Sequence, residues 1–235
     1  MALKRNIQKN APGSTKRQLI TNTDPKSPIS EQYRTIRTNI LFSSVDETLR
    51  SILVTSTSPG EGKSTTISNL AVVFANQGKQ VLLVDADMRK PTMHYTFGLQ
   101  NNIGLTNVLT KQTTMQEAVV KTGIDNLSAL PSGPIPPNPA ELLGSFSMKE
   151  FLAQAQEKYD YVLFDTPPIL AVTDAQLLAN QCDGTVLVIN SGKTEIEAAQ
   201  KAKELLEAAK AKLLGAVLNN QKLKDSAYYY YYGSE

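Results

Sequence analysis

Short apolar segments alternate with amphipathic segments along most of the chain. Strand-like runs lie at 52–54, 81–84, 127–130, 159–165, 184–190 and 213–220. The four successive apolar residues at 81–84 indicate a strand buried on both faces, as in parallel sheets. Between the runs, residues 31–42, 66–75 and 194–212 have helical spacing, with Ser30 and Thr194 as the expected caps of the first and last of these helices. The alternation predicts an α/β fold with a mostly parallel central sheet flanked by helices on both faces.

A glycine-bearing segment, TSPGEGKST at 57–65, lies between the first predicted strand and the helix that follows. This is the context of a phosphate-binding P-loop, because loop N–H groups and a helix N-terminus then converge on one anion. Lys63 would reach the β- and γ-phosphates, and the Ser64 hydroxyl would bind Mg²⁺. Thr57 departs from the consensus G-x-x-x-x-G-K-[ST], which begins with glycine. The expected nucleotide-binding residues are Pro59, Gly60, Glu61, Gly62, Lys63, Ser64 and Thr65.

Acidic residues end two of the other predicted strands. Asp85 and Asp87 follow the run at 81–84, and Asp165 ends the run at 159–165. Ligands bind at the carboxyl ends of strands in open α/β sheets. Two acids at the end of a buried strand are costly unless a cation or a proton-transfer role compensates. An aspartate that ends an apolar strand downstream of a P-loop indicates a Walker B carboxylate, which orients the Mg²⁺ shell.

Composition limits the class of protein. The 235 residues are 41% hydrophobic and 20% charged, which suits one sizeable domain. No apolar run approaches the roughly 20 residues that span a bilayer, so a soluble, cytoplasmic chain is expected. The net charge of +2 is too small to argue for nucleic acid as a partner. The single cysteine, Cys182, fits a reducing compartment and a buried structural thiol.

The two ends of the chain differ from its centre. Residues 1–27 are basic and poor in large apolar groups, which predicts a flexible arm ahead of a domain at 28–220. The arm is either a solvated tail or a segment attracted to an anionic membrane surface or an acidic partner.

Residues 221–235 form an expected flexible tail that carries a run of tyrosines. Identical hydroxyl-bearing side chains on such a tail suit a repeated phosphoryl acceptor, whereas a strand or a sticky end is the simpler alternative. The expected phosphoacceptors are the five consecutive residues Tyr228, Tyr229, Tyr230, Tyr231 and Tyr232.

Glu31, Arg34 and Arg37 recur every three residues in the first predicted helix. They form a charged stripe beside its apolar face. Two explanations remain open. The stripe is either solvated and paired within the helix, or it is a subunit contact in which each glutamate meets an arginine of a neighbouring copy.

Together these motifs resemble the bacterial tyrosine kinases (BY-kinases) of the capsule and exopolysaccharide systems. The resemblance covers nearly the whole chain. It depends on the Walker A segment at 57–65, the Walker A′ segment at 81–89, the Walker B segment at 162–167, the E-x-x-R-x-x-R at 31–37 and the tyrosine cluster. It implies a P-loop NTPase fold and a cytoplasmic kinase subunit that works with a separate transmembrane activator at the inner face of the plasma membrane. It also implies ring-like self-association through Glu31, Arg34 and Arg37.

The same resemblance implies a mechanism with ATP and Mg²⁺. The expected catalytic residues are Lys63, Asp85, Asp87 and Asp165, with Ser64, Asp87 and Asp165 at the metal. A tyrosine hydroxyl has a pKa of about 10, so its proton needs an acceptor at neutral pH. Asp85 is the expected acceptor, and the division of roles between Asp85 and Asp87 is a hypothesis. The phosphoryl group would pass to the tail tyrosines, with transfer expected between subunits, and to other proteins that bear tyrosine.

Two other classes of function stay open. Partitioning and division-site ATPases share the three Walker segments but carry a signature lysine near the start of the P-loop, where this chain has Ser58 and Pro59. A nucleotide-gated assembly protein would bind ATP without net transfer. A GTPase is disfavoured, because no N-K-x-D motif occurs.

Overall fold

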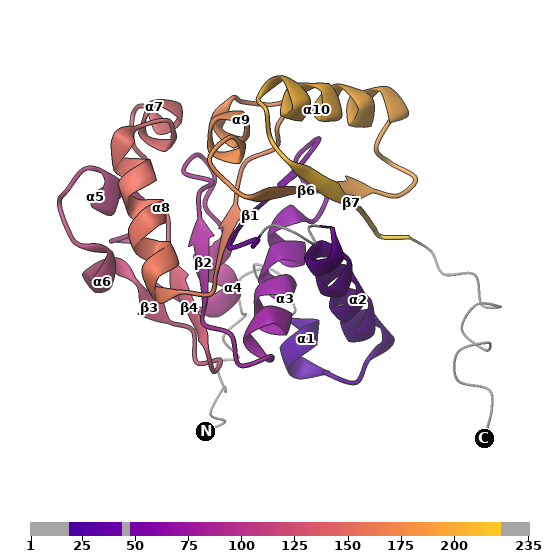
Figure 1. Ribbon diagram of the computed structural model, residues 1–235, viewed down its shortest axis with the longest axis horizontal. Coiled ribbons are helices and arrows are strands. Elements are labelled where there is room, and N and C mark those ends of the chain that lie inside the picture. The colour runs from indigo at the N-terminus through magenta and orange to yellow at the C-terminus, as the bar shows by residue number, and fades with distance from the viewer. Residues whose placement is uncertain (1–18, 44–47, 222–235) are drawn as a thin grey trace, which may run out of the picture.

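A computed structural model describes residues 19–43 and 48–221. Within this part of the chain, one sheet of seven strands has the order β3-β4-β2-β5-β1-β6-β7 (Figure 1). The strands are β1 (Ser51–Ser56), β2 (Val81–Asp85), β3 (Val120–Lys121), β4 (Leu127–Leu130), β5 (Tyr161–Asp165), β6 (Gly184–Asn190) and β7 (Leu213–Asn219).

Two sequence predictions lie outside the described residues. One is the flexibility of residues 1–18 in the basic arm and of residues 222–235 in the tail. The other is the acceptor role of the tail tyrosines, Tyr228, Tyr229, Tyr230, Tyr231 and Tyr232, which stays a prediction.

All neighbouring strands of the sheet are parallel except the short edge pair. β2, β5, β1, β6 and β7 run in one direction with β4, whereas β3 pairs antiparallel with β4. Parallel strands need crossover connections, and helices supply them here. The expected mostly parallel α/β fold is confirmed.

Helices cover both faces of the sheet (Figure 1). One face packs against α2 (Pro28–Phe42), α3 (Lys63–Ala75) and α4 (Met93–Phe97), and α1 (Ile20–Thr23) packs on α3 on the same side. The other face packs against α5 (Leu105–Leu109), α6 (Met115–Ala118), α7 (Pro139–Leu143), α8 (Phe146–Lys158), α9 (Asp174–Ala179) and α10 (Ile196–Ala208). In β2, Leu82 and Val84 enter the core on the α8 side, while Val81 and Leu83 enter the core on the α3 side. The strand therefore has two buried faces, which explains its unbroken apolar run.

The end of the expected arm belongs to the folded domain. Residues 19–27, assigned above to a flexible segment, include α1, which packs on α3. The buried Thr21 donates from its backbone N–H and its hydroxyl to Asn69 Oδ1, at 3.1 and 2.9 Å. The prediction of a flexible segment is therefore wrong for residues 19–27. It failed because these polar contacts leave no hydrophobic pattern in the sequence.

Two predicted helix caps are also wrong. Ser27, not Ser30, caps α2 and accepts a hydrogen bond from the Ser30 N–H at 3.2 Å. Pro28 explains the earlier start, because proline suits the first helical position. At the other helix, α10 begins after Glu195, and the Thr194 hydroxyl accepts instead from the Asn190 N–H at 3.0 Å.

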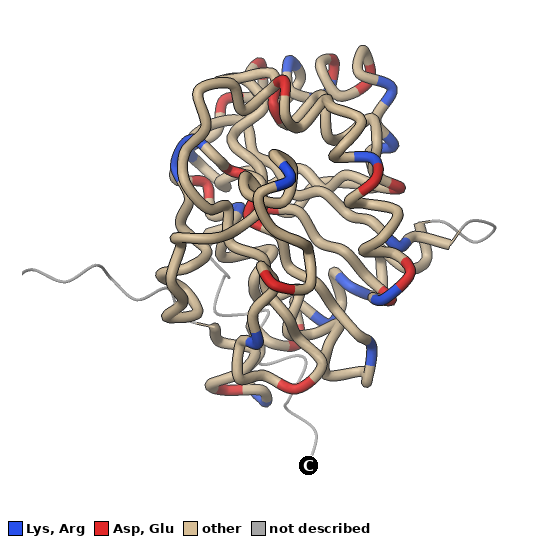
Figure 2. Tube along the Cα trace, turned by 90° about the vertical axis from the view of Figure 1, so that its left-hand side faces the viewer, with Lys and Arg blue, Asp and Glu red and all other residues tan. Residues whose placement is uncertain are grey.

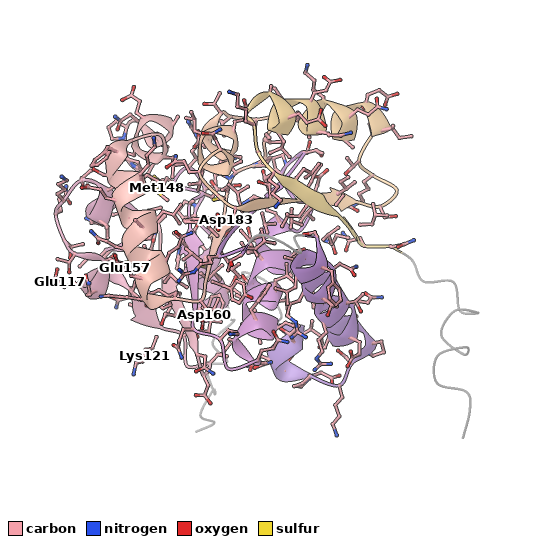
Figure 3. The ribbon with its side chains drawn as sticks, viewed as in Figure 1. Glu117, Lys121, Met148, Glu157, Asp160 and Asp183 are labelled. Carbon is pink, nitrogen blue, oxygen red and sulfur yellow. The ribbon has the colours of Figure 1, made fainter. Side chains whose placement is uncertain are left out.

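The amino ends of the central strands are held by acidic side chains. One oxygen of Asp183 accepts from the N–H groups of Arg50 and Ser51, at 2.9 and 2.8 Å, and so anchors the start of β1 (Figure 3). Asp160 accepts from the Gln80 N–H at 2.8 Å just before β2. These acids lie at the end of the sheet opposite Asp85 and Asp165, and their contacts are structural.

Charge is spread over the surface. Along the trace in Figure 2, basic and acidic positions are interspersed on the visible face. Among residues 19–43 and 48–221, no helix has both the length and the apolar character needed to cross a membrane.

Cys182 is buried, and burial raises the pKa of its thiol, with the charge of Asp183 adding to the effect. A thiol with a raised pKa is a poor nucleophile at neutral pH, as expected of a structural cysteine.

Candidate active site

The P-loop connects β1 to α3 and has the backbone that its glycines predict. Gly60 and Gly62 have φ values of +82° and +96°, in the left-handed region that glycine adopts without strain. A Cβ at Gly62 would also overlap the Asn219 side-chain amide. Helix α3 begins at Lys63, so its first N–H groups face the end of the sheet where β1, β2 and β5 finish. Such a helix N-terminus favours an anion.

Lys63 lies among three oxygen-bearing side chains. Its Nζ atom donates to Asp87 Oδ2 at 3.0 Å, to Asp165 Oδ1 at 3.2 Å and to the Ser64 hydroxyl at 3.3 Å. Burial by itself lowers the pKa of Lys63, but the charges of Asp165 and Asp87 outweigh burial, and the pKa is raised. The ammonium group is therefore charged at neutral pH. Four residues predicted from three separate motifs thus meet at one point.

Asp85 lies beside this group but makes different contacts. It is fully buried and is the register partner of Asp165 in the neighbouring strand. Its oxygens accept from the N–H groups of Asp87 at 3.2 Å and of Thr92 and Met93 at 3.1 Å each. Burial, followed by the negative charge of Asp165, raises the pKa of the Asp85 carboxyl to about 8. Asp85 thus shapes the turn after β2 and holds a proton far more tightly than an exposed carboxyl does.

A cavity of about 510 Å³ opens beside the P-loop. Besides the loop, it is lined by residues that follow β2 and β5, which the sequence did not single out as binding residues: Arg89, Lys90, Thr92, Pro167, Pro168, Ala171 and Val172. Their position just after two acid-ended strands was the signal that could have identified them. A second hollow of about 630 Å³ lies between α2 and β7 and is lined mainly by apolar and neutral polar groups. Because Lys63, Ser64 and Asp87 line the first cavity, it is the candidate active site.

An ion pair joins the two segments that line the cavity. Arg89 Nε and Nη2 each donate to a different oxygen of Asp174 at 2.9 Å. Asp174 is fully buried at the start of α9, whereas the Arg89 side chain is 40% exposed. This bidentate pair ties the end of the Walker A′ segment to the start of α9, the helix that follows the Walker B strand and its loop.

The donor set suits a hard divalent cation. The Ser64 hydroxyl and the carboxylates of Asp87 and Asp165 are oxygen ligands of the kind that Mg²⁺ takes, and they already surround the Lys63 ammonium. Asp165 Oδ2 is buried and accepts no hydrogen bond from the described residues, which leaves one acceptor for such an ion or its water. No group of three or more His, Cys, Asp or Glu side chains with metal-binding geometry occurs in the described part of the chain. Mg²⁺ commonly takes only one or two protein carboxylates and completes its shell with phosphate and water.

Comparison with known proteins identifies the family. A family model described as an AAA domain matches residues 49–214. Tyrosine-protein kinase YwqD of Bacillus subtilis (strain 168) is 58% identical over 229 residues, which cover 97% of each chain. The putative tyrosine-protein kinase CapB of Staphylococcus aureus is 44% identical over 223 residues, or 94% of this chain and 98% of that protein.

The chain belongs to the bacterial tyrosine kinases of the capsule and exopolysaccharide type. The crystal structure of the chimerical protein CapA2B2 superposes on this kinase with a TM-score of 0.84 at 47% identity, covering 87% of this chain and 90% of the other. The cell division ATPase MinD of Pyrococcus furiosus shares the fold less closely, at a TM-score of 0.63 and 27% identity over 75% of this chain and 74% of the other. The resemblance seen in the motifs is confirmed, and the relatives support a kinase enzyme.

The charged stripe on α2 is engaged within the chain. Arg34 forms an ion pair with Glu31 and also donates to the Pro25 carbonyl at 2.6 Å. Arg37 Nη1 donates to the Val73 carbonyl of α3 at 3.0 Å. Glu31 and Arg34 remain accessible at the surface, whereas Arg37 is partly buried and uses one of its donors within its own chain. Their part in an oligomer stays a prediction.

Proposed function

We propose that this chain is an ATP:protein-tyrosine phosphotransferase whose first acceptors are its own tail tyrosines, at 228–232. The observation that supports this most strongly is the convergence of Lys63, Asp87 and Asp165 at the P-loop. Phosphoryl transfer asks a protein mainly to position groups and to neutralise charge, and these side chains suit both tasks. The family's kinases supply the reaction class.

In this proposal the P-loop binds the phosphates of ATP. The N–H groups of residues 60–64 and the Lys63 ammonium hold the β- and γ-phosphates, while Arg89 and Lys90 lie at the rim of the same cavity. Ser64, Asp87 and Asp165 hold Mg²⁺, directly or through water. When bound, Mg²⁺ neutralises charge that develops on the transferred phosphoryl group.

Asp85 is the proposed acceptor of the tyrosine proton. Burial and the neighbouring charge of Asp165 raise the pKa of its carboxyl, so the deprotonated form of Asp85 is a stronger base than an exposed aspartate. Asp85 is buried, and its oxygens accept hydrogen bonds from the turn at 87–93. In the proposed reaction this turn therefore has to give the incoming tyrosine hydroxyl access to the carboxylate. Asp87, which contacts Lys63 directly, is assigned to the metal rather than to proton transfer.

A partitioning-type ATPase is the principal alternative, supported by the shared fold of the division ATPase. The missing signature lysine at Ser58 or Pro59 and the greater similarity to tyrosine kinases favour the kinase. Incubating the purified chain with ATP and Mg²⁺ and blotting for phosphotyrosine tests the proposal. A kinase gives signal that requires both ATP and Lys63. ATP hydrolysis without signal would support the ATPase, and ATP binding with neither would support an assembly protein.

The proposed setting is a ring of identical subunits at the inner face of the plasma membrane. A transmembrane activator would recruit this cytoplasmic chain there, where it would regulate capsule or exopolysaccharide synthesis and modify other proteins that bear tyrosine. Accessible Glu31 and Arg34 support a subunit contact on α2. The uncharged hollow between α2 and β7, with Ile29 and Leu218 exposed, offers adjoining surface for such a contact.

A further inference from the structure

The P-loop contains a buried carboxylate that points away from the phosphate-binding side. Glu61 is only 5% exposed, although residues 58–60 just before it are exposed. Its Oε2 atom accepts from the N–H groups of Thr57 at 2.8 Å and Ser58 at 3.1 Å. Its Oε1 atom accepts from the Thr57 hydroxyl at 2.6 Å. The side chain therefore folds back across the base of the loop and closes it on itself.

Thr57 occupies the position where the general P-loop consensus has glycine. It is buried, and its hydroxyl supplies a hydrogen-bond donor that glycine lacks. Thr57, which replaces the consensus glycine, and Glu61, four residues later, therefore bind each other directly. A carboxylate is satisfied in a buried site when several donors surround it, and Thr57 provides two of them.

Two residues outside the loop complete the arrangement. The hydroxyl of Thr194, in the turn after β6, donates to Glu61 Oε1. The side-chain amide of Asn219, the last residue of β7, donates to the Glu61 carbonyl at 2.9 Å and fills the space beside Gly62. We call Thr57, Glu61, Thr194 and Asn219 the Glu61 cluster. It ties the P-loop to the ends of two strands that do not themselves contribute to the phosphate-binding segment.

We propose that Glu61 is a positioning residue that holds the P-loop in its phosphate-binding shape through the Glu61 cluster. The inference rests on the proposed function, since it concerns how the same loop binds ATP. A loop with two glycines has much conformational entropy to lose when its N–H groups converge on an anion. Contacts that order the loop beforehand remove part of that cost from binding. Glu61 also uses the N–H groups of Thr57 and Ser58, which leaves those of the following residues for phosphate.

The test compares Glu61→Ala with Glu61→Gln by calorimetric titration with ATP and Mg²⁺. Alanine removes every side-chain contact, so ATP affinity should fall roughly tenfold or more, as expected for lost hydrogen bonds to a charged group. Glutamine can accept from the two N–H groups and donate to the two hydroxyls, so it should restore affinity to within about threefold. Glu157→Ala, an exposed glutamate on α8 (Figure 3), is the matched control and should bind as the unaltered protein does.

Three results have distinct meanings. Unchanged affinity in a folded Glu61→Ala variant would overturn the inference while leaving the proposed function intact. Equal losses in Glu61→Ala and Glu61→Gln would also overturn it, because they would show that the charge matters rather than the hydrogen bonds. Failure of the unaltered protein to bind ATP would instead overturn the proposed function, and the inference with it.

Thr194→Val provides an independent arm that leaves the loop sequence unchanged. It removes one donor to Glu61 from outside the loop, so a several-fold weaker affinity for ATP is expected, with unfolding by urea showing that the domain remains folded. In a double-mutant cycle, Thr57→Val and Glu61→Ala should be non-additive, because both remove the same contact. Additive losses, or no loss in Thr194→Val, would contradict the proposed cluster.

Discussion

Lys63 and Asp165 are 102 positions apart in the chain, and their side chains form an ion pair of 3.2 Å. Asp165 is 1% exposed and Lys63 is 12% exposed, so the pair is almost out of water. The pair exists because β1 and β5 are adjacent parallel strands whose carboxyl ends meet at the P-loop. This relationship is the geometric condition for the proposed transfer, since phosphate, metal and acid have to share one edge of the sheet.

Replacing Asp85 by asparagine should separate binding from transfer. The asparagine in Asp85→Asn would keep the size of the side chain and an acceptor for the N–H groups of Thr92 and Met93, but it could not take a proton. We expect transfer to tyrosine to fall by at least roughly 100-fold, the usual scale of general base catalysis, with ATP affinity little changed. Calorimetry and radiolabelled transfer would measure the two quantities. Loss of ATP binding instead would assign Asp85 to the nucleotide and metal.

The Arg89–Asp174 pair predicts an asymmetric effect on stability. Arg89→Ala leaves a fully buried carboxylate unpaired, and we expect the free energy of unfolding to fall by about 2 kcal/mol. This value is below that of a fully buried pair because the Arg89 side chain is 40% exposed and solvent screens its charge. Asp174→Ala should cost less, about 1 kcal/mol, because the arginine can turn into solvent. Urea unfolding of both variants measures the difference. Equal costs would show that burial of Asp174 does not dominate the pair.

Self-association through α2 predicts a change of mass on substitution. Changing Glu31 and Arg34 together to alanine removes the accessible charges, and sedimentation should show smaller species with an unchanged circular dichroism spectrum. The exposed pair Lys201 and Glu204 on α10 is the matched control, and its double alanine variant should keep the mass of the unaltered protein. An unchanged mass for the α2 variant would leave the stripe as a surface pair within one subunit, the simpler of the two explanations.

Transfer between subunits predicts complementation. A Lys63→Met chain has intact tail tyrosines but no phosphate-binding lysine, and a chain with five tail phenylalanines has an intact site but no acceptors. Mixing them with ATP and Mg²⁺ should label the Lys63→Met chain on tyrosine. Each phosphate adds about −1.5 to −2 charges, so the labelled tail should leave the site and loosen the ring. Absence of label would contradict transfer between copies.

Much of the fold could be predicted because its signals are local. Unbroken apolar runs such as 81–84 predicted buried parallel strands, and TSPGEGKST predicted a strand–loop–helix unit at β1 and α3. The grouping of Lys63 with Asp87 and Asp165 followed from one rule, that parallel strands end at the same edge. Their chemical roles remain predictions.

Polar contacts between distant segments could not be predicted. Arg89 and Asp174 are 85 positions apart, and nothing in either neighbourhood specifies the other. The direction of the Glu61 side chain depends on Thr194, which the sequence suggested only as a helix cap. Likewise, α1 is held by Thr21 and Asn69, whose buried hydrogen bonds have no period along the chain. Hydrophobic patterns determine which face is buried but not which polar groups meet there.

The central claim is that Lys63 and the acid-ended strands pass a phosphoryl group to the tail. Mass spectrometry of the C-terminal peptide after incubation of the pure chain with ATP and Mg²⁺ tests it most directly, with Lys63→Met and the exposed Lys79→Met as paired controls. The account predicts phosphate on one or more of the five tail tyrosines in the unaltered and Lys79→Met chains and none in Lys63→Met. An unmodified tail in the unaltered chain, or equal modification of the Lys63→Met chain, would contradict it.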